Sequence, residues 1–152
     1  MKPLALLLAS IAWAENAPLQ FTFTFTESSP TKGTATRKYE TLGSLNEFIR
    51  INSGERVPVR IADDKIQFTD VGTNILCKAR EAQNSTLSLD CNFERSAVAP
   101  GQPPTTQTPR IHTTRVGGMY TVKPGASTQI ARLDDPVTGS QIQIDALISR
   151  IP

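Results

Sequence analysis

The two cysteines, Cys77 and Cys91, are the residues whose spacing most clearly indicates a chemical bond. A polar segment, residues 81–85, separates two strand-like segments, and a hairpin folded about Asn84 puts the cysteines opposite each other. Directly opposed residues of an antiparallel pair have Cα atoms about 4.5–5.5 Å apart, and a disulfide needs about 4.4–6.8 Å. The spacing therefore predicts a cross-strand disulfide; two free buried thiols are the alternative.

The other reactive side chains do not form a recognisable catalytic pattern. His112 is the only histidine, so a Ser-His-Asp or Cys-His site would have to use it, and a histidine-based metal site needs more ligands. We place His112 on the exposed side of a strand. The carboxylate pairs Asp63-Asp64 and Asp134-Asp135 fall in predicted turns, where Asp supports the backbone. We therefore expect a protein that is not an enzyme and that has no catalytic residues, no metal and no cofactor.

The N-terminal residues indicate export. Lys2 precedes a short apolar run, residues 3–12, which is followed by the small-x-small pattern Ala12-Trp13-Ala14. This order is typical of a secretory signal peptide over residues 1–14, and the run is too short to span a bilayer. A buried N-terminal helix is the alternative. Export fits a disulfide, because exported proteins fold in an oxidising space. We expect a periplasmic or extracellular protein, with association to the outer membrane as a further option.

The charge balance excludes some partners. The chain carries 16 Lys and Arg against 14 Asp and Glu, which offers no electrostatic basis for binding nucleic acid or an anionic membrane. No segment after the N-terminus approaches the roughly 20 apolar residues of a membrane helix. We therefore expect no nucleic acid partner and no transmembrane helix in the mature chain.

The dominant hydrophobic period is two, which is typical of half-buried strands. Residues 21–26 alternate Phe and Thr without interruption, and residues 86–93 and 141–148 also alternate. A glycine inside a strand, such as Gly72, indicates a bulge or a close backbone approach, and Pro58 belongs at a sheet edge or a strand start. The pattern predicts an all-β fold, an antiparallel β-sandwich or partly open barrel of about eight to nine strands. The predicted strand segments are residues 21–26, 34–42, 47–51, 57–61, 65–79, 86–93, 110–116, 119–122, 127–133 and 141–148, with a loop over residues 96–108.

From Gly54 onward, the order of short motifs resembles the core domain of secretins, the outer-membrane ring channels of bacterial export machines. The motifs are Gly54-Glu55-Arg56-Val57-Pro58, Phe68-Thr69-Asp70-Val71-Gly72, the strand with Leu87 and Leu89, Thr113-Thr114-Arg115, and Val122-Lys123-Pro124-Gly125. The matching signature positions are Gly54, Val57, Pro58, Asp70, Val71, Gly72, Thr114, Arg115 and Gly125. The chain also resembles small exported bacterial proteins that carry this core alone. The resemblance implies a curved antiparallel sheet that packs side by side into a ring and has no catalytic residues.

The resemblance divides the mature chain, residues 15–152, into three regions of one domain. Residues 15–53 form an N-terminal hairpin region, residues 54–133 the secretin-core-like region, and residues 134–152 a closing strand. Secretins insert a gate hairpin after the Val-Pro element, whereas only residues 59–67 intervene here. The sequence therefore argues against a gated export pore.

These observations favour an exported, non-catalytic β module for binding or assembly in the cell envelope. Its expected contact surfaces are edge strands, since an unpaired edge recruits another strand, and the 96–108 loop. A small outer-membrane β-barrel is one alternative, although the mature chain lacks the Trp of an aromatic girdle. A secreted binding protein that resembles a protease inhibitor is another.

Overall fold

The computed structural model describes residues 17–62, 65–99, 109–136 and 139–152. The predicted signal peptide, the Asp63-Asp64 pair and residues 100–108 of the predicted loop lie outside the described residues. The strands of the described part are β1 (Leu19–Ser29), β2 (Gly33–Gly43), β3 (Phe48–Ala62), β4 (Lys65–Glu81), β5 (Leu87–Val98), β6 (Ile111–Val122), β7 (Thr128–Asp134) and β8 (Gln141–Arg150), with one short helical turn, η1 (Gln83–Ser85). No helix in this part of the chain is long or apolar enough to cross a membrane.

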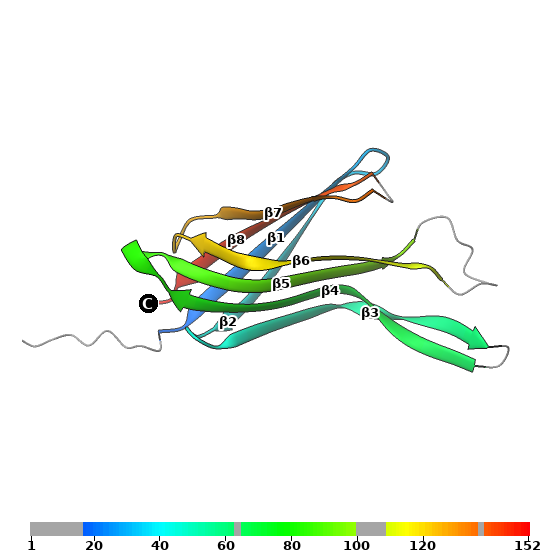
Figure 1. Ribbon diagram of the computed structural model, residues 1–152, viewed down its shortest axis with the longest axis horizontal. Coiled ribbons are helices and arrows are strands. Elements are labelled where there is room, and N and C mark those ends of the chain that lie inside the picture. Colours follow the sequence, from blue (N-terminus) through cyan, green and yellow to red (C-terminus); the bar gives the residue numbers. More distant parts are fainter. Residues whose placement is uncertain (1–16, 63–64, 100–108, 137–138) are drawn as a thin grey trace, which may run out of the picture.

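The described strands form two four-stranded antiparallel sheets (Figure 1). Sheet A has the order β2-β1-β8-β7, and sheet B has the order β3-β4-β5-β6. The predicted all-β class is confirmed. The N-terminal hairpin and the closing strand build sheet A together, because β8 pairs with β1 along almost its whole length. The region that resembles the secretin core supplies sheet B except for residues 48–53 of β3, and it also supplies β7 at one edge of sheet A.

The core lies between the two sheets and follows directly from the alternating pattern. Phe21, Phe23 and Phe25 of β1 are buried, and the edges of the Phe23 and Phe25 rings meet Phe93 of β5 at centroid distances of 5.5 and 6.0 Å. Burying such a side chain stabilises a fold by about 1.5–3 kcal/mol. The other core residues are Leu19, Ile49, Ile75, Cys77, Ala79, Leu87, Leu89, Cys91, Val122, Ile142, Ile144, Ala146 and Ile148.

Several predicted strand ends are wrong, because cross-strand pairing continues through residues that often form turns. The segments 47–51 and 57–61 are one strand, β3, since Gly54 lies in the ladder opposite Gly72 and does not end a strand. The segments 110–116 and 119–122 are also one strand, β6, with Gly117-Gly118 paired to β5. The predicted loop begins too early, since Ser96 still pairs with Thr113.

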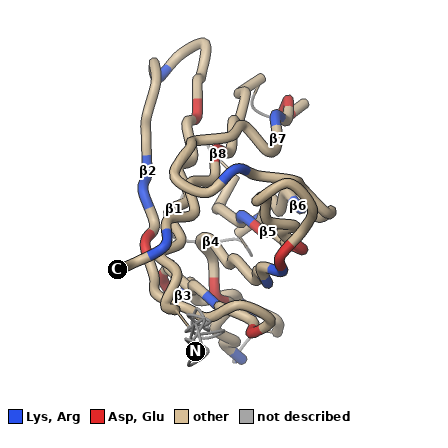
Figure 2. Tube along the Cα trace, turned by 90° about the vertical axis from the view of Figure 1, so that its left-hand side faces the viewer, with Lys and Arg blue, Asp and Glu red and all other residues tan. Residues whose placement is uncertain are grey.

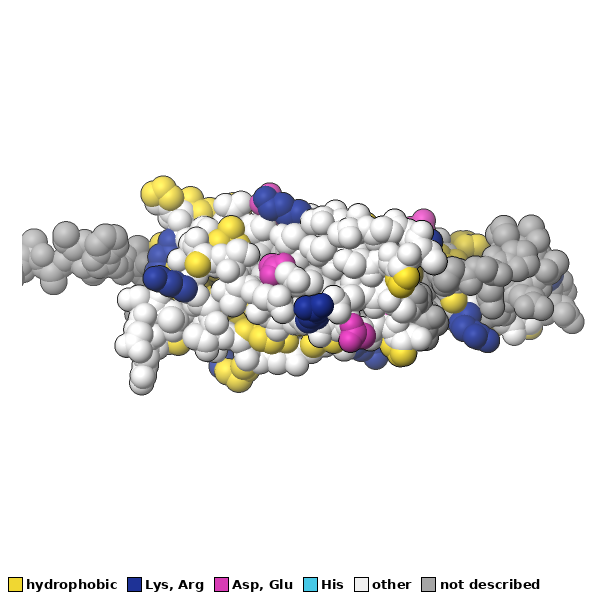
Figure 3. Space-filling view, turned by 90° about the horizontal axis from the view of Figure 1, so that it is seen from above, with side chains coloured by type: hydrophobic (Ala, Val, Ile, Leu, Met, Phe, Trp, Pro, Cys, Tyr) yellow, Lys and Arg dark blue, Asp and Glu magenta, His cyan; other side chains and the backbone are white. Residues whose placement is uncertain are grey.

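The β3–β4 hairpin extends past the sandwich, as the separate ends of β3 and β4 show in Figure 1. The β4–β5 ladder starts at Thr73, and most residues of β3 and β4 on the far side of it are exposed. This projecting part carries three exposed apolar side chains, Ile61, Ile66 and Phe68. Charges of both signs are interspersed along the rest of the chain (Figure 2), and few charged side chains appear on the face seen in Figure 3. The face seen in Figure 3 therefore shows no continuous basic surface.

Candidate functional site: the open edges of sheet B

Sheet B ends in two strands, β3 and β6, each paired on one side only. A strand edge of this kind presents a row of backbone N–H and C=O groups that can pair with another strand. In an antiparallel sheet, successive residues point these groups alternately to one side and the other. The residues whose groups point outward can therefore be identified once one pair is assigned.

The disulfide pair provides that assignment. Cys77 lies opposite Cys91 with a Cα–Cα distance of 4.1 Å, the short separation of a pair that exchanges no hydrogen bonds with each other. The backbone groups of Cys77 therefore point to β3. By the same alternation, the backbone groups of Gly72 should point away from β3, toward β5. The structure agrees, because the N–H of Gly72 donates to Oγ of Ser96 on β5 at 3.1 Å. By this alternation, the β3 residues that direct their backbone groups to the open edge are Arg50, Asn52, Gly54, Arg56, Pro58 and Arg60.

Pro58 lies among these outward positions, opposite Phe68. Proline has no N–H, so at an inward position it would remove a hydrogen bond from the β3–β4 ladder. At an outward position it leaves that ladder complete and removes one donor from the open edge. The predicted edge location of Pro58 is confirmed, and the proline ends the continuous row of edge donors.

Gly54 and Gly72 lie directly opposite each other where the hairpin leaves the sandwich. A Cβ on Gly54 would lie 2.0 Å from the carbonyl oxygen of Val71, and one on Gly72 would lie 2.1 Å from that of Ser53. Gly72 also has φ +144°, a conformation that side chains disfavour. The pairing register does not shift here, so the close-approach alternative is correct and the bulge alternative is wrong.

The remaining signature residues of the hairpin surround this glycine crossing. Val71 is buried, and Val57 is half-buried on β3. Asp70 accepts a hydrogen bond from Nε of Arg56 at 3.1 Å, but both side chains are about three-quarters exposed. An ion pair this exposed contributes little stability. The structure thus brings together the signature residues of β3 and β4.

The other signature residues lie apart from the crossing. Thr114 and Arg115 are on β6, where Nε of Arg115 donates to Oε2 of Glu94 on β5 at 2.5 Å. Gly125 lies in the β6–β7 turn with φ +79°, and its N–H donates to the carbonyl of Ile148 at 2.8 Å. The signature residues therefore lie on β3, β4 and β6 and in one turn; Gly54, Asp70, Val71 and Gly72 line one hollow, and Arg115 lines an adjoining one.

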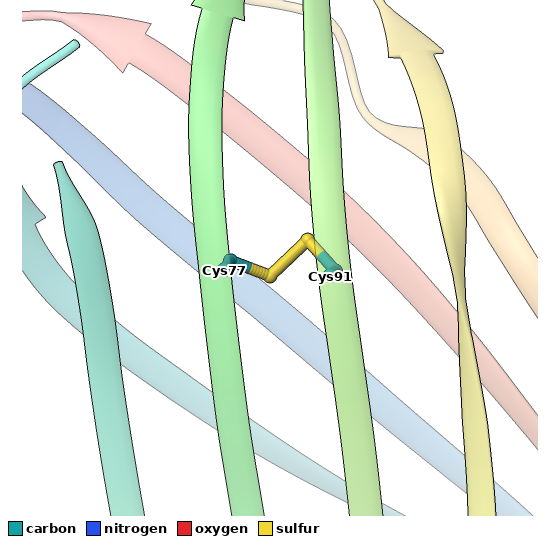
Figure 4. Close-up of a disulfide and its surroundings, with 2 residues drawn as sticks. All are labelled: Cys77 and Cys91. Carbon is teal, nitrogen blue, oxygen red and sulfur yellow. A yellow bond between two sulfur atoms is a disulfide. The ribbon is translucent and has the colours of Figure 1, made fainter. Parts of the chain in front are cut away.

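The cysteines form the predicted disulfide, which joins β4 and β5 (Figure 4). Both cysteines are completely buried and face sheet A with the core residues. The turn between their strands contains Asn84 at φ +59°, where the pattern placed the centre of the hairpin. The bridge therefore holds the middle of sheet B and takes no part in an exposed site.

The sequence predicted that His112 lies on the exposed side of a strand, and this prediction is wrong. Its side chain is half-buried, because the connection between β7 and β8 brings Asp135 to within 3.1 Å of its Nε2. The hydroxyl of Thr114 is 3.5 Å from the same nitrogen. Because both partners contact Nε2, the imidazole cannot relay a proton from one to the other as a catalytic triad does. Among the described residues there is also no group of three His, Cys, Asp or Glu that could hold a metal.

Sequence reasoning missed the polar contacts between the sheets. Arg95 of β5 forms an ion pair with Glu27 of β1 at 2.5 Å, and Arg37 of β2 lies 3.7 Å from the same carboxylate. Among the Arg–Glu ion pairs of the described residues, this pair is the least exposed to solvent, with side-chain exposures of 19% for Arg95 and 28% for Glu27. Only the order of the strands brings these charges together, and no local motif could have indicated it.

The two-sheet fold is a secretin-core-like fold. It is similar to the secretin domain β-barrel of InvG from the Salmonella SPI-1 injectisome, with a TM-score of 0.69 and 10% sequence identity over 90% of this chain and 64% of that chain. It is also similar to ExeD of Aeromonas hydrophila (TM-score 0.57, 11% identity, 88% of this chain and 47% of that one) and to the type II secretion system secretin GspD of E. coli K12 (TM-score 0.53, 12% identity, 88% and 48%). This chain thus spans less than two thirds of the length of these neighbours. No family model and no curated protein matches the sequence.

Proposed function

We propose that this chain is a non-catalytic β module of the bacterial cell envelope that assembles with copies of itself through the open edges of sheet B. Three observations support the proposal. The fold is secretin-core-like, the buried disulfide suits an exported protein in an oxidising space, and the similar structures are parts of secretion machines. We accordingly propose a periplasmic or extracellular location.

The observation that carries the proposal is the direction of the two edge strands. Sheet B has four strands that alternate in direction, so β3 and β6 are antiparallel to each other. When copies stand side by side, related by a rotation about an axis along the strands, β6 of one copy meets β3 of the next in the antiparallel sense. Such a head-to-tail contact continues the sheet and forms a ring if the rotation closes.

The edge donors set the extent of this contact. On β3 the outward row is continuous from Arg50 to Arg56 and is interrupted at Pro58. On β6 the outward residues are Thr113, Arg115, Gly117, Met119 and Thr121, since Cys91 directs its backbone groups to Gly118. We therefore expect the edge of β6 to pair with residues 48–57 of the neighbouring β3 and to leave the projecting hairpin beyond Pro58 free.

Size-exclusion chromatography with light scattering, on the oxidised mature protein over a range of concentrations, tests this proposal. Met119→Pro removes an outward donor of β6 and should abolish self-association while the far-ultraviolet spectrum stays that of a β protein. Met119→Ala is the matched control, because it removes the side chain but keeps the N–H, and it should assemble normally. Pro58→Ala restores a donor on β3 and should strengthen association.

A protein that is strictly monomeric at its highest soluble concentration would contradict self-assembly. So would a Met119→Ala variant that loses association as completely as Met119→Pro, since the side chain and not the backbone edge would then be responsible.

A further inference from the structure

The outer face of sheet B, which faces away from sheet A, carries two adjoining hollows of about 540 and 240 Å³. Asn74 and Glu94 line both, so the hollows form one continuous depression, called here the polar trough. Strands β3 to β6 lie side by side beneath it (Figure 1). Neither the secretin signature as a whole nor the proposed edge contact accounts for this surface.

The trough crosses all four strands. The pairing register puts Asn52 opposite Asn74, Asn74 opposite Glu94, and Glu94 opposite Arg115, which makes one row across the sheet. Four strands at a spacing of about 4.8 Å give this row a length of roughly 14 Å. An extended ligand can therefore lie across the strands.

Glycines form the floor of the trough. Gly54 and Gly72 are in the row next to Asn52 and Asn74, and their backbones are too close for a Cβ. Gly117 lies on β6 opposite Asn92, and a Cβ there would lie 2.2 Å from Oδ1 of Asn92. At Gly54 and Gly72 the backbone pairing itself therefore requires the hollow, whereas at Gly117 the side chain of Asn92 lies over the backbone.

The amide groups of the trough are available to a ligand. Asn52, Asn74 and Asn92 are exposed on the same face, and in the described part of the chain none of their side chains makes a hydrogen bond. Each amide offers two donors and one acceptor oxygen. Three such groups on one face match a ligand that carries both donors and acceptors along its length.

The charges of the trough are balanced. Three arginines (Arg50, Arg56 and Arg115) and three carboxylates (Glu55, Asp70 and Glu94) line it, and two of the arginines are paired with two of the carboxylates. A balanced surface does not attract a polyanion or a polycation.

The surface of the trough also argues against ligands that stack on aromatic rings and against peptides that pair as strands. Phe93 lines the smaller hollow, but only 2% of its surface is exposed, so the trough offers no aromatic face. Within the β4–β5 ladder, which runs from Thr73 to Glu81 on β4 and from Leu87 to Arg95 on β5, the backbone groups are used on both sides, so a peptide cannot add as a strand there. A neutral chain of hydroxyl and amide groups satisfies all of these conditions.

We propose that the polar trough binds a neutral oligosaccharide that lies across the strands of sheet B. The asparagine amides hydrogen-bond its hydroxyl groups, and they pair best with a sugar that carries acetamido groups, because two amides can exchange two hydrogen bonds. The arginines and carboxylates at the sides bind further hydroxyl groups.

An NMR titration of the oxidised mature protein labelled with ¹⁵N tests the proposal, with chitotetraose as the acetamido-bearing probe and maltotetraose as the probe without acetamido groups. Chitotetraose should shift the amide signals of Gly54, Gly72 and Gly117 and the side-chain amide signals of the trough asparagines. Each lost hydrogen bond corresponds to a loss of about 2- to 10-fold in affinity, so Asn52→Ala with Asn74→Ala should weaken binding by about 5- to 100-fold. Ser88→Ala, on the same face but outside the trough, is the control and should bind unchanged.

The proposal is overturned if neither sugar shifts the glycine signals at millimolar concentration, or if the double asparagine variant binds as well as the wild type. It is also overturned if heparin, an anionic polymer, competes more strongly than chitotetraose, because the charge argument would then be wrong. Tighter binding of maltotetraose would retain the site and refute the amide pairing. The assembly-defective Met119→Pro variant should bind chitotetraose normally, so failure of the edge contact and failure of the trough are distinguishable.

Discussion

Substituting Gly72 by alanine tests whether the glycine crossing governs the geometry of sheet B. The backbone there has φ +144°, a region that costs a residue with a side chain about 1–3 kcal/mol. The new Cβ would also lie 2.1 Å from the carbonyl oxygen of Ser53, and relieving such overlap costs a further 1–3 kcal/mol or so. We therefore expect Gly72→Ala to lower the free energy of unfolding by about 2–6 kcal/mol, a large part of the 5–15 kcal/mol of a typical domain.

Two matched variants separate these contributions. At Gly125 the backbone has a positive φ of +79°, but an added Cβ would have no heavy atom within 4 Å. Gly125→Ala should therefore lower the free energy of unfolding by only about 1–2 kcal/mol. Gly54→Ala meets the overlap without a positive φ and should cost about 1–3 kcal/mol. Urea unfolding followed by far-ultraviolet circular dichroism, under oxidising conditions, measures all three. If Gly72→Ala costs no more than Gly125→Ala, the close approach of the two strands is not a constraint and the reasoning is refuted.

Three further predictions concern the core and the contacts between sheets. Reducing the Cys77–Cys91 bridge, which spans a sequence separation of 14, should lower the free energy of unfolding by less than about 3 kcal/mol, because the β4–β5 ladder already holds the ends together; an unchanged urea midpoint with reductant would contradict this. Burial raises the pKa of Tyr120 above its ordinary 10.0. The stability that depends on the neutral form of Tyr120 is therefore fully present below about pH 10 and is lost as the pH rises through the raised pKa. Ultraviolet titration should show this late ionisation in the wild type and not in Tyr120→Phe. Arg95→Met leaves Glu27 without its closest partner between the sheets and should cost about 1 kcal/mol after allowance for solvent screening, as measured by urea unfolding; a more stable variant would contradict a stabilising role for the pair.

The sequence predicted the elements that depend on neighbouring residues. The Phe-Thr alternation of β1 has a period of two, which only a half-buried strand satisfies, and the structure buries Phe21, Phe23 and Phe25 as expected. The cysteine pairing was predictable for the same reason. Both cysteines lie on alternating strands around a short polar turn, so local geometry alone puts Cys77 opposite Cys91.

The sequence predicted strand ends wrongly at turn-forming residues that pair with a partner strand. Gly54 and the Gly117-Gly118 pair have the composition of turns, but both lie in strands, because the adjacent strand, β4 or β5, pairs with them on one side. The conformational freedom of glycine permits either result.

The sequence by itself determined that the chain folds as β-strands, several of which have one apolar face, and that two cysteines close a hairpin, because these properties depend on alternation and short spacing. Only the tertiary structure decided which strands are edges and that Pro58 lies at a position whose backbone groups point to the open edge. It also decided that three asparagines share one face with three glycines. These features depend on strand order and register between segments far apart in the chain. Register is set by the packing of the two sheets, which no local pattern contains.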